Sequence, residues 1–376
     1  MRDECIATAP DLQDNVLIRM LRGREHQEFH VTIRPAPSET PTAMVARLAA
    51  VLRAHGALIV RQEIFGAADV ESEIRRALHD QIGPLEWPVL SVAGASANGS
   101  PSAGIHTMAV ADTPVMVIAV NGDVVGSLFA DGDAQHVLLA GVRPSVAAQP
   151  KPIQARQVFE NLESALQQSG MSCADLMRTW LFLDDILAWY GPFNQVRTEF
   201  YQQRHVPGTV LPASTGIGVG NSTGAALVAA AWAARGLNGA FAAREISSPL
   251  QGPPQAYGSR FARAVEIISG GLRRALVSGT ASITKDGPSA HRGDMRGQVD
   301  WTMNVVREIL ASRAMSFADV TRATAYIKHP QDAPVFDAWL ADHGLRAWPV
   351  LLITPATVCR DELLFEIELD AISTEV

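Results

Sequence analysis

Three acidic side chains alternate with apolar ones near the end of this 376-residue chain, in the segment 365–370. In a β-strand successive side chains point to opposite faces, so the three carboxylates would share one face of the strand. A carboxyl group buried among apolar residues stays protonated at neutral pH, because burial raises its pKa, and it can then act as a general acid. Glu366, between Phe365 and Ile367, is one candidate for such an acid, as are Glu368 and Asp370. The alternative interpretation is a sheet face in contact with solvent.

Cysteines and histidines do not form the patterns of a metal site or a disulfide framework. The three cysteines, Cys5, Cys173 and Cys359, are an odd number without a CxxC spacing. His26 and His30 lie four residues apart, but no third ligand is placed near them, which favours a solvated face. The sequence also lacks a nucleotide-binding motif. We therefore expect neither a metal nor a cofactor.

An internal repeat supplies the elements that must position Glu366. The segment Met171–Arg178 (MSCADLMR) recurs as Met315–Arg322 (MSFADVTR). Each copy follows an amphipathic helical pattern and precedes a strand-like run, a second helix, a proline and a terminal strand. Long copies that mix helices with strands are typical of a duplicated unit rather than a solenoid. The sequence therefore predicts an α+β fold with two tandem units.

The repeat divides the chain into three parts. Residues 1–95 have no partner in the repeat and are expected to form an N-terminal α/β elaboration packed on the first unit. The first unit is expected over residues 96–240 and the second over residues 250–376. The proline-rich segment 248–254 is the expected linker between the two units.

The two copies differ at the position of the candidate acid. Aligning Pro212 with Pro349, and the two terminal strands with each other, places Ala229 opposite Glu366. The first unit is therefore expected to be degenerate and the second catalytic.

The order of these elements resembles the RidA/YjgF fold, which is like that of chorismate mutase. That resemblance implies a mixed sheet in each unit with two helices packed on one face. Longer motifs resemble the chorismatases, two-unit enzymes of this fold. They are Pro212–Gly218 (PASTGIG), Tyr257 with Phe261–Ala264 (FARA), Ser278–Ile283 (SGTASI) and Val358–Glu368 (VCRDELLFEIE). The resemblance runs from about residue 110 to the C-terminus and implies a functional glutamate at Glu366.

One difference from the wider fold family argues against one of the reactions known for this fold. RidA-type imine deaminases hold a substrate carboxylate with the arginine of a Pro-x-Arg motif. The two equivalents here read Pro212-Ala-Ser214 and Pro349-Val-Leu351, without arginine. A deaminase is therefore a poor interpretation, and the fold alone does not decide the activity.

The resemblance to chorismatases implies cleavage of the enol ether of chorismate. Glu366 would protonate the methylene carbon, and pyruvate would leave. Gly279 and Cys359 resemble the type that forms 3-hydroxybenzoate, with or without 4-hydroxybenzoate, where the glycine makes room and the cysteine assists ring opening. An ordinary buried cysteine and a β-bulge glycine are the plain alternatives. A hydrolase that gives a dihydroxycyclohexadiene carboxylate, or a non-catalytic small-molecule binding protein, are the other functions to consider.

The two carboxylates of chorismate require arginines or other hydrogen-bond donors. Our candidates for this binding role are Arg263, Tyr257 and Arg178, with Thr280 and Arg360 as further ones. Arg178 has a repeat partner in Arg322, so a structural role shared by the two copies is an equally good interpretation.

The amino-acid composition argues against some classes of binding partner. Lys and Arg number 31 against 39 Asp and Glu, a net charge of −8, which argues against binding to nucleic acid or to an anionic membrane. The first fifteen residues lack the apolar segment of a signal peptide, and the longest apolar runs are too short to span a bilayer. We expect a cytoplasmic enzyme of secondary metabolism. Pockets in this fold usually lie between units, so homo-oligomerisation remains open.

Overall fold

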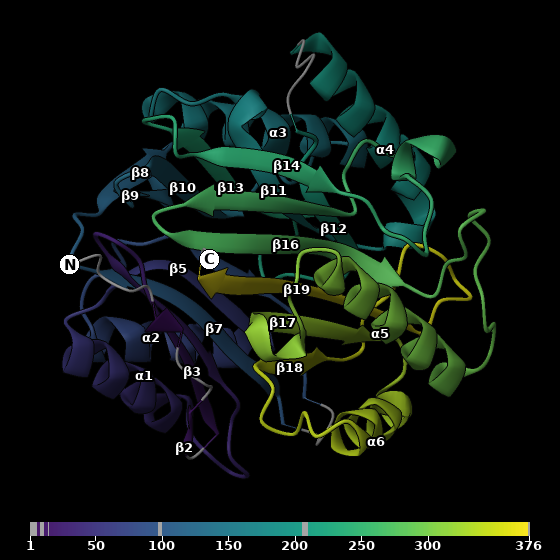
Figure 1. Cartoon of the computed structure of the whole chain (residues 1–376), viewed down its shortest axis with the longest axis horizontal. Coiled ribbons are helices and arrows are strands. Elements are labelled where there is room, and N and C mark those ends of the chain that lie inside the picture. The colour runs from purple at the N-terminus through teal and green to yellow at the C-terminus, as the bar shows by residue number, and fades with distance from the viewer. Residues whose placement is uncertain (1–5, 8–10, 14, 97–99, 205–209, 375–376) are drawn as a thin grey trace.

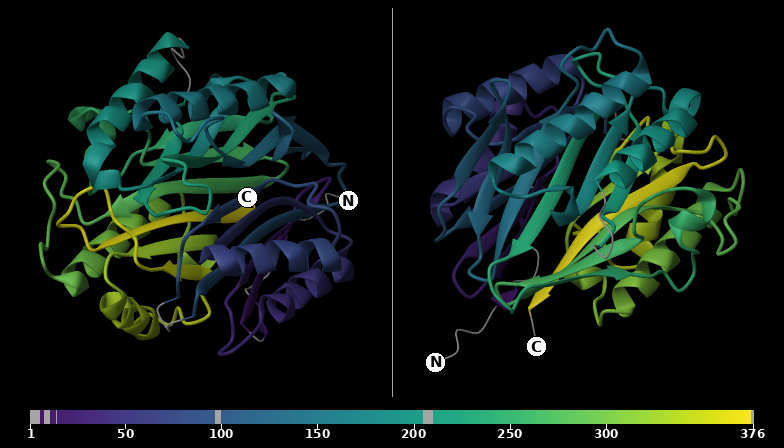
Figure 2. Two further views of the ribbon diagram at one scale, coloured as in Figure 1. Left: turned by 180° about the vertical axis from the view of Figure 1, so that it is seen from behind. Right: turned by 90° about the horizontal axis from the view of Figure 1, so that it is seen from above.

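The computed structural model describes residues 6–7, 11–13, 15–96, 100–204 and 210–374. In this part of the chain, three mixed β-sheets and six α-helices form three units around a common centre (Figure 1). The sheets lie inside and the helices cover them on the outside, as the view from behind also shows (Figure 2). The predicted α+β class is confirmed.

The elements fall into an N-terminal, a middle and a C-terminal unit. The N-terminal unit contains β1 (Ile6–Ala7), β2 (Asp11–Gln13), β3 (Val16–Arg22), β4 (Gln27–Ile33), α1 (Pro41–His55), β5 (Leu58–Gly66), α2 (Ala68–Gln81), β6 (Val89–Val92) and β7 (Ser102–Ala111). The middle unit contains β8 (Met116–Val120), β9 (Asp123–Ala130), β10 (Ala134–Val142), α3 (Lys151–Gln168), β11 (Leu176–Leu183), α4 (Ile186–Gln203), β12 (Ala213–Gly218) and β13 (Leu227–Gly236). The C-terminal unit contains β14 (Ala242–Ile246), β15 (Ala264–Ser269), β16 (Leu272–Ala281), α5 (Met295–Ala311), β17 (Val320–Ile327), α6 (Ala333–Asp342), β18 (Val350–Ile353) and β19 (Phe365–Thr374).

All three sheets have the same strand order. It reads β3-β4-β7-β5-β6 in the N-terminal unit, β9-β10-β13-β11-β12 in the middle unit and β15-β16-β19-β17-β18 in the C-terminal unit. The segment expected as an unrelated N-terminal elaboration is therefore a third copy of the same topology. It also extends beyond the expected boundary at residue 95, because β7 pairs with β4 and β5 and belongs to this sheet.

The repeated Met-Ser-x-Ala-Asp motif forms the turn between helix and strand. Ser172 and Asp175 make a capping box, in which the Ser172 backbone N donates to Asp175 Oδ2 at 2.8 Å. Ser316 and Asp319 repeat this arrangement at 2.7 Å. In the N-terminal unit, α1 instead ends at Gly56, which has φ +59°. This different turn explains why the third copy is not visible in the repeated motif.

Each sheet packs its outer face against its own two helices and its inner face against the other sheets. The central core contains side chains of all three units, among them Phe65, Trp180 and Tyr326. Three separate apolar clusters lie under the helices of the three units. Both faces of the strands are therefore buried, and a carboxylate on an inner face is removed from solvent.

Three arginines at equivalent positions meet at the centre. Arg61, Arg178 and Arg322 each follow a register shift in β5, β11 and β17. Their guanidinium carbons lie 3.6, 4.7 and 5.3 Å from the centroid of the Trp180 ring. Glu368 joins the middle and C-terminal units here, because its Oε2 lies 2.7 Å from Arg178 Nη2 and its Oε1 lies 2.7 Å from Arg322 Nη2.

Electrostatics hold Glu368 in its charged form. Burial acts to raise the pKa of Glu368, but Arg322 and Arg178 outweigh burial and bring the pKa below its usual range. Trp180 Nε1 donates a further hydrogen bond to Glu368 Oε2 at 2.7 Å. Glu368 is thus a structural anion at the centre of the molecule.

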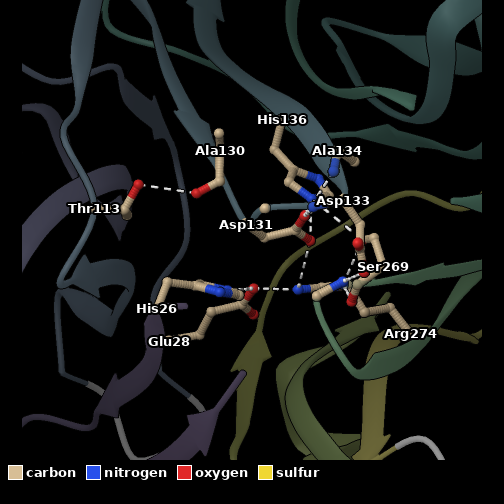
Figure 3. Close-up of polar contacts among 12 residues, drawn as sticks. His26, Glu28, Thr113, Ala130, Asp131, Asp133, Ala134, His136, Ser269 and Arg274 are labelled. Carbon is tan, nitrogen blue, oxygen red and sulfur yellow. Dashed lines mark hydrogen bonds and ion pairs between the residues drawn. The ribbon is translucent and has the colours of Figure 1, made fainter. Parts of the chain in front are cut away.

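A second buried polar cluster joins the three units through β4, β10 and β16 (Figure 3). Glu28 pairs with Arg274 and lies 2.9 Å from His26 Nε2. His136 Nε2 lies 2.8 Å from Asp131 Oδ2. His26, predicted to lie on a solvated face, is therefore buried in an ion-pair network just before β4, where its partner is the carboxylate of Glu28 on that strand.

The register corrects the position that replaces Glu366 in the middle unit. Tyr326 pairs with Glu366, and Phe182, the repeat partner of Tyr326, pairs with Val228. Val228 is therefore the equivalent residue, and the predicted Ala229 is wrong by one position. A shift of one residue turns a side chain to the other face, and Ala229 indeed packs under the helices.

No helix in the described ranges is long and apolar enough to cross a membrane.

Candidate active site

Glu366 lies on the inner face of β19, where only 4% of its surface is exposed. Its cross-strand neighbours are Tyr326 on β17 and Ala281 on β16. Among the described residues, no hydrogen-bond partner of the Glu366 carboxyl group is found. Glu368, two residues further on the same face, accepts four hydrogen bonds from three residues, Arg178, Trp180 and Arg322, so the two glutamates differ sharply in environment.

This environment raises the pKa of Glu366 to about 8. Burial is the largest cause, since it disfavours the charged form, and the negative charge of Glu368 adds to it. Arg178 and Arg263 act in the opposite direction but are outweighed. At pH 7 Glu366 is therefore a neutral carboxylic acid that can give up a proton.

Gly279 provides the space for this carboxyl group. It lies in the irregular register of β16 between Val277 and Thr280. A Cβ atom at this position would collide with Glu366 Oε1 and would lie 3.1 Å from Thr215 Cγ2. Even an alanine would displace the acid, which gives a physical reason for a glycine here.

The middle unit completes the site with Thr215 and Arg178. Thr215 Oγ1 accepts hydrogen bonds from the Gly279 backbone N at 3.0 Å and from Arg178 Nη2 at 2.7 Å. The same Arg178 nitrogen contacts Glu368. Arg178 Nε and Nη1 are buried and have no hydrogen-bond partner among the described residues. Arg178 is thus both structural, as its repeat partner suggested, and a source of two unused donors beside Glu366.

Backbone contacts fix the two units against each other at this site. The Gly218 backbone N donates to Thr357 O at 2.7 Å, and the Thr357 N donates back to Gly218 O at 2.8 Å. The Ser214 backbone N donates to Ser278 Oγ at 2.8 Å. The site therefore lies on a rigid interface between β12 of the middle unit and β16 of the C-terminal unit.

Comparison of the three equivalent interfaces singles out this one. The position of Glu366 is held by Val228 in the middle unit and by Gly104 in the N-terminal unit. The position of Thr215, opposite Trp180, is held by Leu90 and Leu351 in the other two units. A Cβ atom at Gly104 would lie 2.9 Å from Leu351 Cδ2, so apolar contacts fill the equivalent space there. Only the interface between the middle and C-terminal units combines an acid with hydroxyl and guanidinium donors at these positions.

Cys359 lies beside the candidate acid on the loop before β19. Its side chain packs against the central core and the core of the middle unit. Burial, and after it the charge of Glu366, raises the pKa of the Cys359 thiol to about 12. The group is therefore a neutral thiol at pH 7 and not a preformed thiolate.

Of the predicted binding residues, Arg263 lies at the site. It is buried, its charge lowers the pKa of Glu366, and its Nε and Nη2 donate to Gly252 O at 3.1 and 3.0 Å. The side chain of Tyr257 lies outside the described residues, so its predicted role stays a prediction.

Two predicted residues, Thr280 and Arg360, make hydrogen bonds to groups other than Glu366. Thr280 pairs with Ile367, which faces the helices, and its hydroxyl donates to Ser278 O at 2.8 Å. It is therefore placed on the opposite face from the acid. Arg360 Nη1 donates to Gly287 O at 2.7 Å, which directs it to the loop that precedes α5.

Sequence reasoning missed Thr215 and Tyr326. Thr215 is part of the motif Pro212–Gly218, but nothing in the sequence distinguishes the threonine that faces inward. Tyr326 could have been found, because the repeat pairs it with Phe182 and shows a hydroxyl gained on one copy only.

Comparison with solved structures finds a chorismatase with a TM-score of 0.62 and 18% sequence identity. The alignment covers 83% of this chain and 92% of that chain. The chain has the fold of a chorismatase. The resemblance expected from the motifs is thus confirmed for the fold, and the α+β architecture with RidA-like units agrees with it.

Smaller proteins match about a third of the chain. They include the protein YJGH, with 20% identity, 35% of this chain and 97% of that chain covered and a TM-score of 0.29. Another is E. coli TdcF with bound serine, with 21% identity, coverage of 32% and 98% and a TM-score of 0.28. The sequence family described as Endoribonuclease L-PSP matches residues 137–228. Comparison with curated proteins finds no match.

The arrangement on this chorismatase-like fold can transfer a proton to an anionic ligand. A neutral carboxylic acid lies next to Arg178 and Arg263, which favour negatively charged groups. No group of three or more metal-ligating side chains is found in the described part of the chain.

Proposed function

We propose that this protein cleaves the enol ether of chorismate to a hydroxybenzoate and pyruvate, with Glu366 as the general acid. The observation that carries the proposal is a glutamic acid kept neutral by burial, beside unused Arg178 donors, at one of three equivalent interfaces. The fold shared with a chorismatase supports the choice of substrate.

The first step is protonation of the enol-ether methylene on carbon. Glu366 supplies this proton, because a group with a pKa of about 8 is still protonated at neutral pH but acidic enough to donate. The product of the step is an oxocarbenium ion next to the new Glu366 carboxylate. Cleavage of the bond between the ether oxygen and the ring then releases pyruvate.

Arg178 and Arg263 hold the two carboxylates of the substrate in this proposal. Arg178 offers Nε and Nη1, which are buried and lack partners among the described residues. A guanidinium group in a dry site favours a carboxylate strongly, because hydrogen bonds between oppositely charged groups are stronger than those between neutral ones. The net charge of −8 then belongs to the outer surface, while the site itself is locally positive.

Gly279 and Cys359 favour the branch that leads to 3-hydroxybenzoate, with or without 4-hydroxybenzoate. Because the ether oxygen leaves with pyruvate, the hydroxyl of the product is the 4-oxygen of the ring. In this branch the 4-oxygen bonds to ring C3 as pyruvate leaves and gives up its proton, and the resulting epoxide ring opens at the C4–O bond and loses the C3 proton on aromatisation. No water is consumed, so this branch is a lyase reaction. The Cys359 thiol lies close enough to Glu366 for that group to influence its pKa. In this proposal the thiol assists ring opening once Glu366 has given up its proton.

Incubation with chorismate tests the proposal. Pyruvate is measured by coupling to lactate dehydrogenase, and the aromatic products are separated by chromatography. Release of pyruvate with hydroxybenzoate supports the proposal. Pyruvate with the dihydroxycyclohexadiene carboxylate would identify the hydrolase instead, and absence of pyruvate would indicate a non-catalytic binding protein.

Activity is expected to fall as the pH rises through about 8. Glu366 must be protonated to act, and its pKa of about 8 sets the point at which the acid is lost. Above this pH, kcat/KM for chorismate should decrease about tenfold for each pH unit. A series of initial rates at different pH values measures this decrease in kcat/KM. A value that stays constant up to pH 10 would exclude Glu366 as the acid.

Substitution of Cys359 is expected to change the product and not the release of pyruvate. Cys359→Ala removes the thiol beside Glu366, so the fraction of hydroxybenzoate should fall and that of the diol should rise. Chromatography of the products from equal amounts of consumed chorismate gives the ratio. Cys173→Ala is the matched control, because Cys173 is buried under the helices of the middle unit. Equal product ratios in both variants would refute the role of Cys359.

A further inference from the structure

Tyr326 carries a hydroxyl group that the fold does not use. The residue is fully buried in the central core, on the inner face of β17. Its hydroxyl has no hydrogen-bond partner among the described residues. A buried hydroxyl without a partner is costly, because it loses its hydrogen bonds to water and gains none in the protein. Such a group calls for a partner that comes from outside the chain.

The three units provide an internal comparison for this hydroxyl. Tyr326 pairs with Glu366, Phe182 pairs with Val228, and Phe65 pairs with Gly104. Packing at this position is therefore satisfied by a phenyl ring in two units out of three. Of these three equivalent residues, only the one opposite the candidate acid carries a hydroxyl group. We therefore relate the hydroxyl to the site, since packing of the fold does not require it.

The surroundings of the hydroxyl make it a donor and not a base. Burial, and then the negative charge of Glu368, raise the pKa of Tyr326 well above its usual value. Glu63 and Glu366 act in the same direction, and Arg322 opposes them. The phenol remains neutral over the whole physiological range and can offer its hydrogen to an acceptor.

We propose that Tyr326 is a further substrate-binding residue, which donates its phenolic hydrogen to the carboxylate of the enolpyruvyl group. This inference rests on the proposed cleavage of chorismate. Glu366 must reach the methylene carbon of that group, and the carboxylate is bonded to the neighbouring carbon. A donor on the residue directly opposite Glu366 is therefore close to the end of the substrate where the proton is transferred.

Binding to an inactive background isolates this contact. The dissociation constant of chorismate is measured by calorimetry for Glu366→Gln and for Glu366→Gln with Tyr326→Phe. The added substitution should weaken binding about 10- to 100-fold, the usual effect of one hydrogen bond to a charged group. With Glu366 intact, Tyr326→Phe should lower kcat/KM by a similar factor, mainly through KM.

Tyr201→Phe is a matched control. Tyr201 is also buried with an unpartnered hydroxyl, but it packs under the helices of the middle unit. This variant should keep the KM of the unaltered protein. Tyr326→Phe should fold normally, with an unfolding temperature equal to or above that of the unaltered protein, since Phe65 and Phe182 fill the equivalent positions.

The outcomes separate this inference from the proposed function. If Glu366→Gln does not bind chorismate and the unaltered protein releases no pyruvate, the proposed function fails. If pyruvate is released but Tyr326→Phe leaves both the dissociation constant and KM unchanged, the role of Tyr326 is refuted. A lower unfolding temperature with unchanged KM would also refute it, because the hydroxyl would then be structural.

Discussion

Glu366→Gln is expected to lower the rate of pyruvate release from chorismate by about 10³-fold, within the range that general acid catalysis contributes. The amide keeps the size of the side chain but has no transferable proton. The fold should be unaffected, because the described structure shows no hydrogen bond to the Glu366 carboxyl group. Coupling to lactate dehydrogenase under saturating chorismate measures the effect on kcat.

Glu362→Gln is the control for this substitution. Glu362 lies four residues earlier, on the partly exposed loop before β19. The same chemical change there should leave kcat within about twofold, as is usual for surface positions. Residual activity of more than a tenth in Glu366→Gln would mean that another group donates the proton.

Two glutamates on the same face of β19 are expected to have opposite effects on stability. Glu366→Gln should raise the free energy of unfolding by about 3 kcal/mol at pH 7, because the buried carboxyl must be neutral when folded but is ionised when unfolded. Glu368→Gln should lower it by about 3–5 kcal/mol, because Arg178 and Arg322 then lose a buried counter-ion.

The two effects also differ in their dependence on pH. The folded-state pKa of Glu366 is raised, so its destabilising effect is absent below the unfolded pKa and grows up to about pH 8. The advantage of Glu366→Gln should therefore increase by about 1.4 kcal/mol for each pH unit between about 5 and 8. The folded-state pKa of Glu368 is depressed, so its contribution is complete above the unfolded pKa and is lost only in acid.

Urea unfolding of the unaltered protein and both variants at pH 5 and pH 8 measures these differences. The Glu368→Gln penalty should be the same at both pH values, whereas the Glu366→Gln advantage should be large only at pH 8. Destabilisation by Glu366→Gln at pH 8 would show that the carboxylate, and not the acid, is the native form.

The sequence, together with its resemblance to chorismatases, was enough to select Glu366 as the candidate acid. Alternation along residues 365–370 placed Glu366 on one face of a strand, and that face is buried in the centre as required. The repeat predicted two units with the same order of helices and strands. These features depend on periodic patterns, which are local and readable in one sequence.

The partners of the acid could not be predicted in the same way. The N-terminal copy has a glycine-terminated helix instead of the Ser-x-x-Asp turn, so the shared topology left no shared motif. The alignment of Ala229 with Glu366 was wrong by one residue, because it was carried over from Pro212 and Pro349. The segment between the proline and the paired strand position is one residue longer in the C-terminal unit, where Glu366 pairs with Tyr326 as Val228 pairs with Phe182. Thr280 was likewise predicted at the site, although a register shift in β16 turns it to the other face.

Arg178 shows a further limit of sequence patterns. The arginine shared by the two copies suggested a structural role, and the need of the substrate carboxylates for hydrogen-bond donors suggested a binding role. The structure shows the structural role, because one nitrogen of the guanidinium group pairs with Glu368. The binding role stays a proposal, which rests on two other nitrogens without a partner among the described residues. A pattern of residue types does not show which nitrogen atoms of one arginine are used in the fold and which remain available to a ligand.

The protonation state of Glu366 at neutral pH is the point on which the proposed chemistry depends most directly. Infrared difference spectra between the unaltered protein and Glu366→Gln, recorded from pH 5 to pH 10, report it without substrate. A carboxylic acid band that is present at pH 7, absent from the variant and lost with a midpoint near pH 8 is the expected result. A Glu366 that is already a carboxylate at pH 6 would contradict its role as the acid.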